Sequence, residues 1–375
     1  VALVAGCNSQ SVRSTTPTSV AASLAGAPEG ELLDVGIDIF DPGLGNIDEK
    51  QPVTTPAVRQ AEARYVPHTL KETLQRSGNW GAVRVIPDRQ SETDVYVEGT
   101  ILHSDGDTLK VRVAVSDAAG RQWFDRSYEE QVSKYAYDDG LRRTGEPFQN
   151  LYNRVANDML EYRRRLSSED VAEVRTVAKL KFARAFAPEA FSEYLESDGR
   201  GRYRVRRLPA EGDPVMARIE AIRERDHLFV DTLQEHYNAF VRQMEFPYRD
   251  WRSQAYRESR ALKELNAQAV ANTIGGVLAV VGGILAQGSD SAVVRSAGAV
   301  GIGAGLYGVK RGMDKRSEAR MHAAGLEELA DSLTSEIRPY TVELEDRTVT
   351  LTGTVEEQYA QWRGILAEMY AAERG

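Results

Sequence analysis

Residues Thr273–Gly308 read TIGGVLAVVGGILAQGSDSAVVRSAGAVGIGAGLYG. Two apolar segments, Ile274–Ala286 and Ala297–Val309, flank a polar turn at Gln287–Ser296. Each glycine weakens a helix in water by about 1 kcal/mol relative to alanine, so glycines at helical spacing indicate a second role. Small residues on one face let helix backbones approach closely. The stretch therefore predicts a helical hairpin that packs through its glycines against a partner helix.

This hairpin resembles the glycine-zipper hairpins of bacterial envelope lipoproteins, and the resemblance implies membrane contact over residues 273–312. Each arm reaches about 18 residues only with its flanking residues included, which is near the lower limit for a span. A Gly/Ala-rich helical pair buried in soluble protein or in an oligomer remains the alternative. The residues expected on the packing face are Gly275, Gly276, Gly282, Gly283, Gly298, Gly301, Gly305 and Gly308.

The composition is that of a folded protein. The 375 residues are 42% hydrophobic and 27% charged, which fits two or three domains. A net charge of −9 argues against a general nucleic-acid binder. The chain has one cysteine, which excludes an intrachain disulfide and a cysteine-based metal cluster.

The single cysteine, Cys7, ends the sequence LVAGC over residues 3–7, which resembles a bacterial lipobox. The resemblance implies that residues 1–6 are the remnant of a signal peptide and that Cys7 becomes the lipidated N-terminus. The covalent lipid is then the only cofactor expected. Asn8 is compatible with transport to the periplasmic face of the outer membrane of a Gram-negative bacterium. A cysteine buried by chance remains the alternative.

Two further units follow Cys7. Residues 7–30 are rich in Ser, Thr, Ala, Pro and Gly and predict a flexible tether. Residues 31–165 predict a small α/β domain, because strand-like alternation, a helical period and turn signals succeed one another. The expected elements are strands at Leu32–Phe40, Ala82–Ile86, Val95–His103, Leu109–Ser116 and Gln122–Tyr128, and helices at Val58–Ser77 and from Phe148.

This order of elements, with the strand DVYVEG at residues 94–99, resembles the small α/β domain of certain periplasmic proteins. Examples are the curli secretion lipoprotein, the polysaccharide-export lipoprotein of the Pel type and the N-terminal domain of the Tol translocation protein. The resemblance implies binding to other envelope proteins and assembly into rings. It assigns no catalytic residue to this chain.

Residues 166–272 predict a helical domain. Ser167 with Asp170 forms a capping-box signature, and Asp213-Pro214 marks the start of a long helix. Pro247 is expected to kink or interrupt that helix, with a second helix from Tyr248 leading into the hairpin. The expected apolar face comprises Val215, Ile219, Ile222, Phe229, Leu233, Tyr237, Phe240, Val241 and Met244.

Residues 313–375 predict a small αββα tail, with a helix near Leu326–Leu333, strands at Tyr340–Leu344 and Thr348–Thr352, and a helix at Val355–Ala372. The sequence VTLTGTV at residues 349–355 resembles the core of BON domains, which are envelope modules associated with membrane contact. An ordinary hairpin-to-helix junction is the alternative.

Two basic groups are candidates for contact with lipid headgroups. Lys310 and Arg311 follow the hairpin directly. Arg202, Arg204 and Arg206 lie in a run of arginines that also contains a tyrosine. Ordinary solvated surface is the alternative for both groups.

The sequence carries no signature of catalysis. Its five histidines have no metal-ligand spacing, and no nucleophile elbow, phosphate-binding loop or zinc motif occurs. Asp38 and Asp41 lie at the end of a predicted strand, just before Pro42-Gly43, and are expected to be turn formers. No catalytic residue and no metal are therefore predicted.

The sequence thus predicts an α+β, lipid-anchored structural protein of the outer membrane that is not an enzyme. It is expected to self-associate into a ring or scaffold, as a candidate part of an envelope-spanning conduit. Membrane lipid, further copies of the chain and other envelope proteins are the expected partners, and nucleic acid is not. A monomeric or dimeric envelope-maintenance module that binds lipid or peptidoglycan is the alternative.

Overall fold

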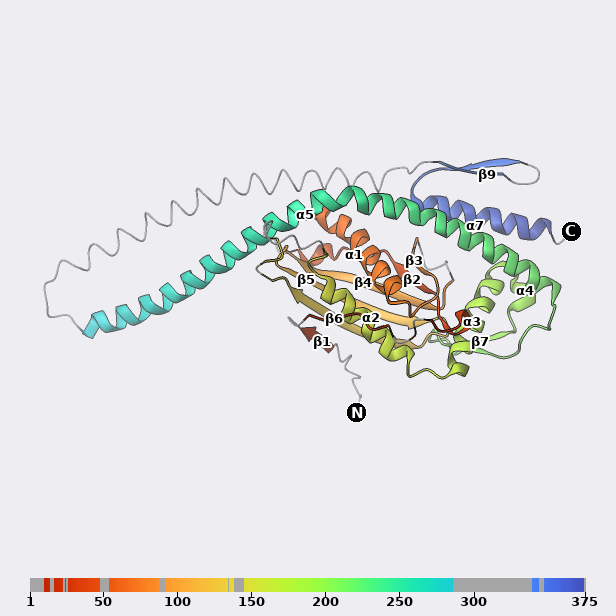
Figure 1. The fold of residues 1–375 in the computed structure, drawn as a ribbon, viewed down its shortest axis with the longest axis horizontal. Coiled ribbons are helices and arrows are strands. Elements are labelled where there is room, and N and C mark those ends of the chain that lie inside the picture. The colour runs from red at the N-terminus through yellow and green to blue at the C-terminus, as the bar shows by residue number, and fades with distance from the viewer. Residues whose placement is uncertain are drawn as a thin grey trace.

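A computed structural model describes residues 10–13, 17–22, 24, 26–47, 54–87, 92–133, 135–137, 145–285, 339–343 and 347–373. The fold is α+β, as the sequence predicts. Figure 1 shows one body built around a sheet, with a single long helix that runs along the body and then leaves it.

The sheet has six strands in the order β1-β6-β5-β4-β2-β3. β4, β5 and β6 form an antiparallel meander, whereas β2 runs parallel to both β3 and β4. β1 pairs in parallel with β6 at the other edge. The strands are β1 Gln10–Arg13, β2 Val35–Asp38, β3 Val83–Ile86, β4 Val95–Ser104, β5 Thr108–Asp117 and β6 Gln122–Gln131.

Helices α1 (Pro56–Ser77) and α2 (Gln149–Arg163) lie side by side over the sheet (Figure 1). α1 begins where the Thr55 side chain accepts a hydrogen bond from the Val58 N–H, with proline in the first turn. It ends at Gly78, whose φ of 65° suits glycine. These helices and strands confirm the elements expected between residues 31 and 165, with small shifts at their ends.

The rest of the body is mainly helical. The capping box at Ser167 is confirmed, and a second capping box starts the last helix at Thr354. The remaining elements are η1 Glu29–Glu31, η2 Leu44–Asn46, α3 Ser168–Phe186, α4 Pro188–Phe191, β7 Leu195–Ser197, β8 Tyr203–Val205, α5 Pro214–Leu285, β9 Tyr340–Glu343, β10 Thr348–Leu351 and α7 Val355–Ala372.

α5 is one helix of 72 residues, about 108 Å long at the usual rise per residue. It begins as expected, because the Asp213 carboxylate accepts from the N–H groups of Val215 and Met216. Of the two outcomes expected at Pro247, a kink or an interruption, the interruption is wrong, since the helix continues through the proline. The side chains of Met244, Tyr248 and Trp251, on both sides of the proline, are buried against α1 and hold the helix in place.

The expected apolar face of α5 is confirmed: Ile219, Ile222, Phe229, Leu233, Tyr237, Phe240 and Met244 are buried. Most of these side chains share one hydrophobic core with the sheet. Residues 166–272 also contain the β7–β8 hairpin, whereas the sequence predicts a helical region here.

The N-terminal segment differs from the predicted tether. β1 is a sheet strand, and the following backbone is held by asparagine side chains of α2. The Thr18 and Ala21 N–H groups donate to Asn150 and Asn157 over 3.0 and 2.8 Å. Asn153 donates to the Thr18 carbonyl over 2.6 Å. Since the partners lie more than 130 positions away in sequence, local composition gave no sign of this docking.

The C-terminal strands and final helix are confirmed, and α7 packs beside α5 (Figure 1). The Trp362 and Phe229 rings stack at 4.9 Å, and the Tyr359 hydroxyl donates to Asp226 over 3.2 Å. The expected helix at residues 326–333 and the second arm of the hairpin lie outside the described residues. Within the described part of the chain, no helix is both long and apolar enough to cross a membrane.

Gly99 tests the packing of the sheet. A Cβ at Gly99 would lie 2.3 Å from the buried Phe40 ring. We expect Gly99→Ala to lower the free energy of unfolding by about 1–3 kcal/mol, because the ring must move. Gly364 in α7 is the control, since nothing lies within 4 Å of its added Cβ. Gly364→Ala should raise stability by up to about 1 kcal/mol. Urea denaturation measures the unfolding free energy of both variants. Equal changes in the two variants would contradict the close contact between Gly99 and Phe40.

Candidate functional site at the junction of the body and the long helix

One side of α5 contacts the body through polar side chains at helical spacing. They link the helix to the sheet edge, to α1 and to the β4–β5 turn. Such a stripe beside an apolar face fixes both the rotation of the helix and its position along the body. The residues of this junction on α5 are Asp231, Gln234, Asn238, Tyr248, Arg252, Ser259, Arg260 and Lys263.

Gln234 completes the sheet edge at β3. Its side-chain amide accepts from the Val85 N–H over 2.9 Å and donates to the Val85 carbonyl over 2.8 Å. The amide therefore replaces a neighbouring strand and protects an otherwise open edge. Next to it, Arg84 and Asp231 form a two-pronged ion pair with distances of 2.6 and 2.9 Å.

Glu62 is the buried centre of the junction. Its carboxylate accepts from the Tyr248 hydroxyl of α5 over 2.7 Å and from the Ser104 hydroxyl at the end of β4. Burial raises the pKa of Glu62, although Arg59 and these two hydroxyls act in the opposite direction. One side chain on α1 thereby holds both the sheet and α5.

Arg252 forms the second buried contact. Its guanidinium donates to Glu146 over 2.6 Å, and both side chains are almost fully buried. The Tyr65 hydroxyl also donates to Glu146, over 2.9 Å. The guanidinium lies 4.2 Å from the centre of the Tyr248 ring, a cation–π distance. Burial acts to lower the pKa of Arg252, but Glu146 and the nearby tyrosines hold it well above its ordinary value.

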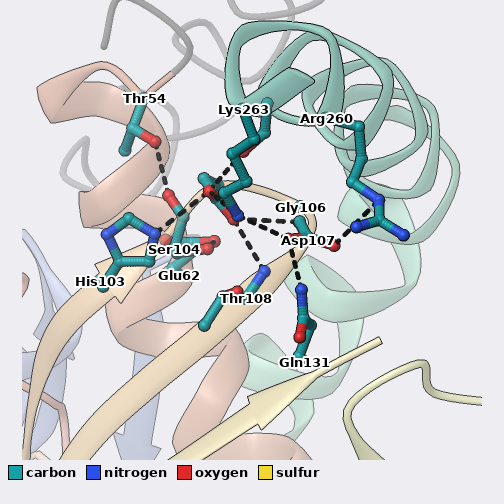
Figure 2. Close-up of polar contacts among 12 residues, drawn as sticks. Thr54, Glu62, His103, Ser104, Gly106, Asp107, Thr108, Gln131, Arg260 and Lys263 are labelled. Atoms are coloured by element: carbon teal, nitrogen blue, oxygen red, sulfur yellow. Dashed lines mark hydrogen bonds and ion pairs between the residues drawn. The ribbon is translucent and has the colours of Figure 1, made fainter. Parts of the chain in front are cut away.

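The tip of the β4–β5 hairpin meets the last docked turns of α5 (Figure 2). The Asp105 carboxylate accepts from the Ser259 hydroxyl over 2.6 Å and from the Thr108 N–H over 2.7 Å. His103 lies 3.2 Å from the same carboxylate. Burial would raise the pKa of Asp105, but the hydrogen bonds from His103 and Ser259 hold it well below its ordinary range.

Asp107 binds the cations of α5, as Figure 2 shows. Its carboxylate lies 2.5 Å from the Lys263 ammonium and 3.9 Å from the Arg260 guanidinium. Gln131, at the end of β6, donates to the same carboxylate over 3.0 Å. Burial acts to lower the pKa of Lys263, but Asp107 and Asp105 raise it more. The pKa of Lys263 therefore lies above its ordinary value.

Gly106 lets the two backbones approach. Its φ is 78°, and a Cβ there would lie 2.4 Å from the Arg252 carbonyl oxygen. Glycine is therefore required both for the turn and for the close contact with α5. The Ser104-Asp105-Gly106-Asp107 sequence predicts the hairpin turn, but not that a helix more than 140 residues later binds it.

The junction is built for attachment, since its carboxylates are already bound by hydroxyls and cations. The described residues contain no group of three or more His, Cys, Asp or Glu side chains arranged to hold a metal. A polar groove of about 470 Å³ lies elsewhere on the sheet. It is lined by Asp41, whose carboxylate accepts from the Gly43 N–H over 2.7 Å as expected of a turn former, and by Arg112 paired with Asp125.

Those residues predicted from sequence that the structure describes do not take part in the junction. Gly275, Gly276, Gly282 and Gly283 lie on α5 beyond Lys263. Arg202, Arg204 and Arg206 lie on or beside β8. The other predicted site residues are outside the described residues: Cys7, Gly298, Gly301, Gly305, Gly308, Lys310 and Arg311.

Sequence reasoning missed Tyr248, Arg252, Ser259 and Lys263. Their spacing of four, seven and four residues places them on one side of a helix, which was the available signal. Charged helix residues usually face solvent, so the spacing alone did not reveal burial.

Comparison of the chain with protein-family models, with curated protein sequences and with solved structures finds no match.

Removing Arg252 tests the buried ion pair. Arg252→Met should lower the free energy of unfolding by about 3–5 kcal/mol, because Glu146 is left buried without its partner. Arg249→Met, three positions earlier on an exposed site, should change stability by less than about 0.5 kcal/mol. Chemical denaturation measures the unfolding free energy of both variants. Similar small losses of stability in the two variants would show that the Arg252–Glu146 ion pair does not hold the helix.

The lowered pKa of Asp105 predicts acid sensitivity. A carboxyl with a lowered folded-state pKa stabilises the protein above its unfolded value of about 3.9. That contribution is lost as the pH falls from there toward the folded-state pKa. Between pH 5 and pH 2.5 the unfolding free energy should fall more steeply for the natural chain than for Asp105→Asn. Parallel curves for the two proteins would contradict the contact with Ser259 and His103.

Proposed function

We propose that this protein is a lipid-anchored structural protein of the bacterial outer membrane that self-associates through the end of α5. The single observation that carries the proposal is the course of this helix. α5 is fixed to the body as far as Lys263 and then continues to Leu285 away from the body (Figure 1). We call residues 264–285 the arm. It carries four of the glycines predicted to pack against a partner helix.

Packing against a partner helix would stabilise the arm. Four glycines within nine residues cost a helix in water about 4 kcal/mol relative to alanine. The docked part of α5 provides the costly nucleus from which the arm propagates. A second glycine face, from this chain or from another copy, would repay the cost through close backbone packing. Both a bilayer and an oligomer offer that environment.

The proposed anchor is consistent with the N-terminal docking. Only two residues separate Cys7 from Gln10, the first residue of β1. A lipid on Cys7 would therefore hold β1, the edge strand next to β6, within about 10 Å of the bilayer surface. The body would then lie close to the membrane, with no enzymatic role assigned to it.

The alternative is a monomeric or dimeric module that binds lipid or peptidoglycan. The polar groove on the sheet favours this alternative, because Thr100, Gln122, Arg112 and Asp125 in its lining suit a hydroxyl-rich ligand such as a glycan.

The mass of the full chain in mild detergent tests self-association. We expect a discrete assembly that falls to the monomer when Thr273–Gly308 is deleted, as measured by light scattering after size-exclusion chromatography. Replacing Gly275, Gly276, Gly282 and Gly283 with leucine should also dissociate it, because large side chains separate the helices.

Replacing the same four glycines with alanine is the control, since alanine keeps the face small and the arm helical. If the natural chain is monomeric in detergent, the scaffold proposal is contradicted and the binding module is favoured. An assembly that survives the deletion would place the contacts on the body instead.

A further inference from the structure

The β7–β8 hairpin is rigidly mounted on the body. The Tyr203 N–H donates to the Ala119 carbonyl over 2.9 Å and so links the hairpin to the turn after β5. The Arg206 N–H donates to the Tyr194 carbonyl over 2.9 Å and closes the hairpin itself. At Gly120 the two backbones come so close that a Cβ would lie 2.0 Å from the Gly201 carbonyl oxygen. A short hairpin held in this way presents its side chains in a fixed direction.

Strand alternation separates the side chains of this hairpin into two faces. Tyr203 faces α3, where Lys181 and Arg184 lie 5.3 and 5.1 Å from its ring centre. Arg202, Arg204 and Arg206 alternate with the half-buried residues and are all exposed. We call these three arginines the arginine face. Alternate residues of a strand are about 6.7 Å apart, so the charges form a short row.

The arginine face has few acids of its own. Among the described residues, none of the three side chains forms an ion pair. Glu196 lies opposite Arg204 across the hairpin, and Glu193 pairs with Arg207 at 3.6 Å. The Asp198 carboxylate accepts from the backbone N–H groups of Arg200 and Arg202. These bonds, together with the positive charges of the same two arginines, lower its pKa.

Exposed like charges in a row repel one another. Several arginines of the body have carboxylate partners, as Arg84, Arg112, Arg121, Arg126, Arg154 and Arg252 do. The arginine face therefore has the chemistry of a site whose anions come from outside the chain. Guanidinium groups bind phosphate oxygens in two-pronged fashion.

We propose that the arginine face binds the phosphate groups of an anionic lipid surface. A lipid surface is favoured over a polynucleotide because the proposed lipid anchor and arm would already hold the body beside a membrane, where short-range contact with headgroup phosphates is sufficient. The β7–β8 hairpin lies at the end of the body away from the arm (Figure 1). It is thus a second membrane contact, separate from the arm, and rests on the proposed function only in placing the body beside a membrane.

Flotation with vesicles tests the site, using the full chain. Vesicles of phosphatidylcholine alone report on the arm and the lipid anchor. The additional binding gained when phosphatidylglycerol is included reports on the arginine face. Arg202→Gln/Arg204→Gln/Arg206→Gln should remove that gain, by about fivefold per arginine and on the order of 100-fold in all. The gain should also shrink as salt is raised.

Arg164→Gln/Arg242→Gln/Arg249→Gln is the matched control, since it removes the same charge from three exposed arginines elsewhere. It should keep most of the gain. Equal losses in both triple variants, or no gain with phosphatidylglycerol, would overturn the arginine face as a lipid site. Binding to a single-stranded oligonucleotide without any gain on vesicles would also overturn it, in favour of a polynucleotide. Failure to bind neutral vesicles would count against the arm or the anchor alone.

Discussion

The ion pair between Arg252 and Glu146 is the constraint on which the placement of α5 depends. A charge buried without its partner costs several kcal/mol, so the helix has one acceptable position along the body. Sliding α5 by one turn would move Arg252 away from Glu146 and Tyr248 away from Glu62 at the same time. Apolar packing alone would tolerate such a shift more easily, because it is not directional.

Because α5 has one fixed position, the body and the free end of the helix are structurally distinct parts. The sheet, α1 and α2 form a core that α5 shares, and α7 adds to the same core from the other end of the chain. The turn at Asp105–Asp107 binds the last docked residues, Ser259 and Lys263. Beyond them the direction of the arm is set by the docked part. Such a design suits a protein whose partner, whether lipid or another copy, meets the arm in a defined orientation.

The sequence predicted what local signals control. Ser167 with Asp170 and Asp213-Pro214 mark helix starts that the structure confirms. Proline inside a helix removes one backbone hydrogen bond and destabilises the helix. At Pro247 the burial of Met244 and Tyr248 outweighs this cost.

The junction could not be predicted in the same way. Gln234 with Val85, Arg252 with Glu146 and Ser259 with Asp105 join residues more than 100 positions apart. Exposed and buried arginines have the same local pattern in sequence. The most direct measurement is hydrogen exchange along α5 in the natural chain and in Asp105→Asn/Asp107→Asn. We predict strong amide protection up to the turn containing Lys263, with protection lost in the variant only around residues 256–264. Uniform exchange along α5 in the natural chain, or no change in the variant, would contradict the account.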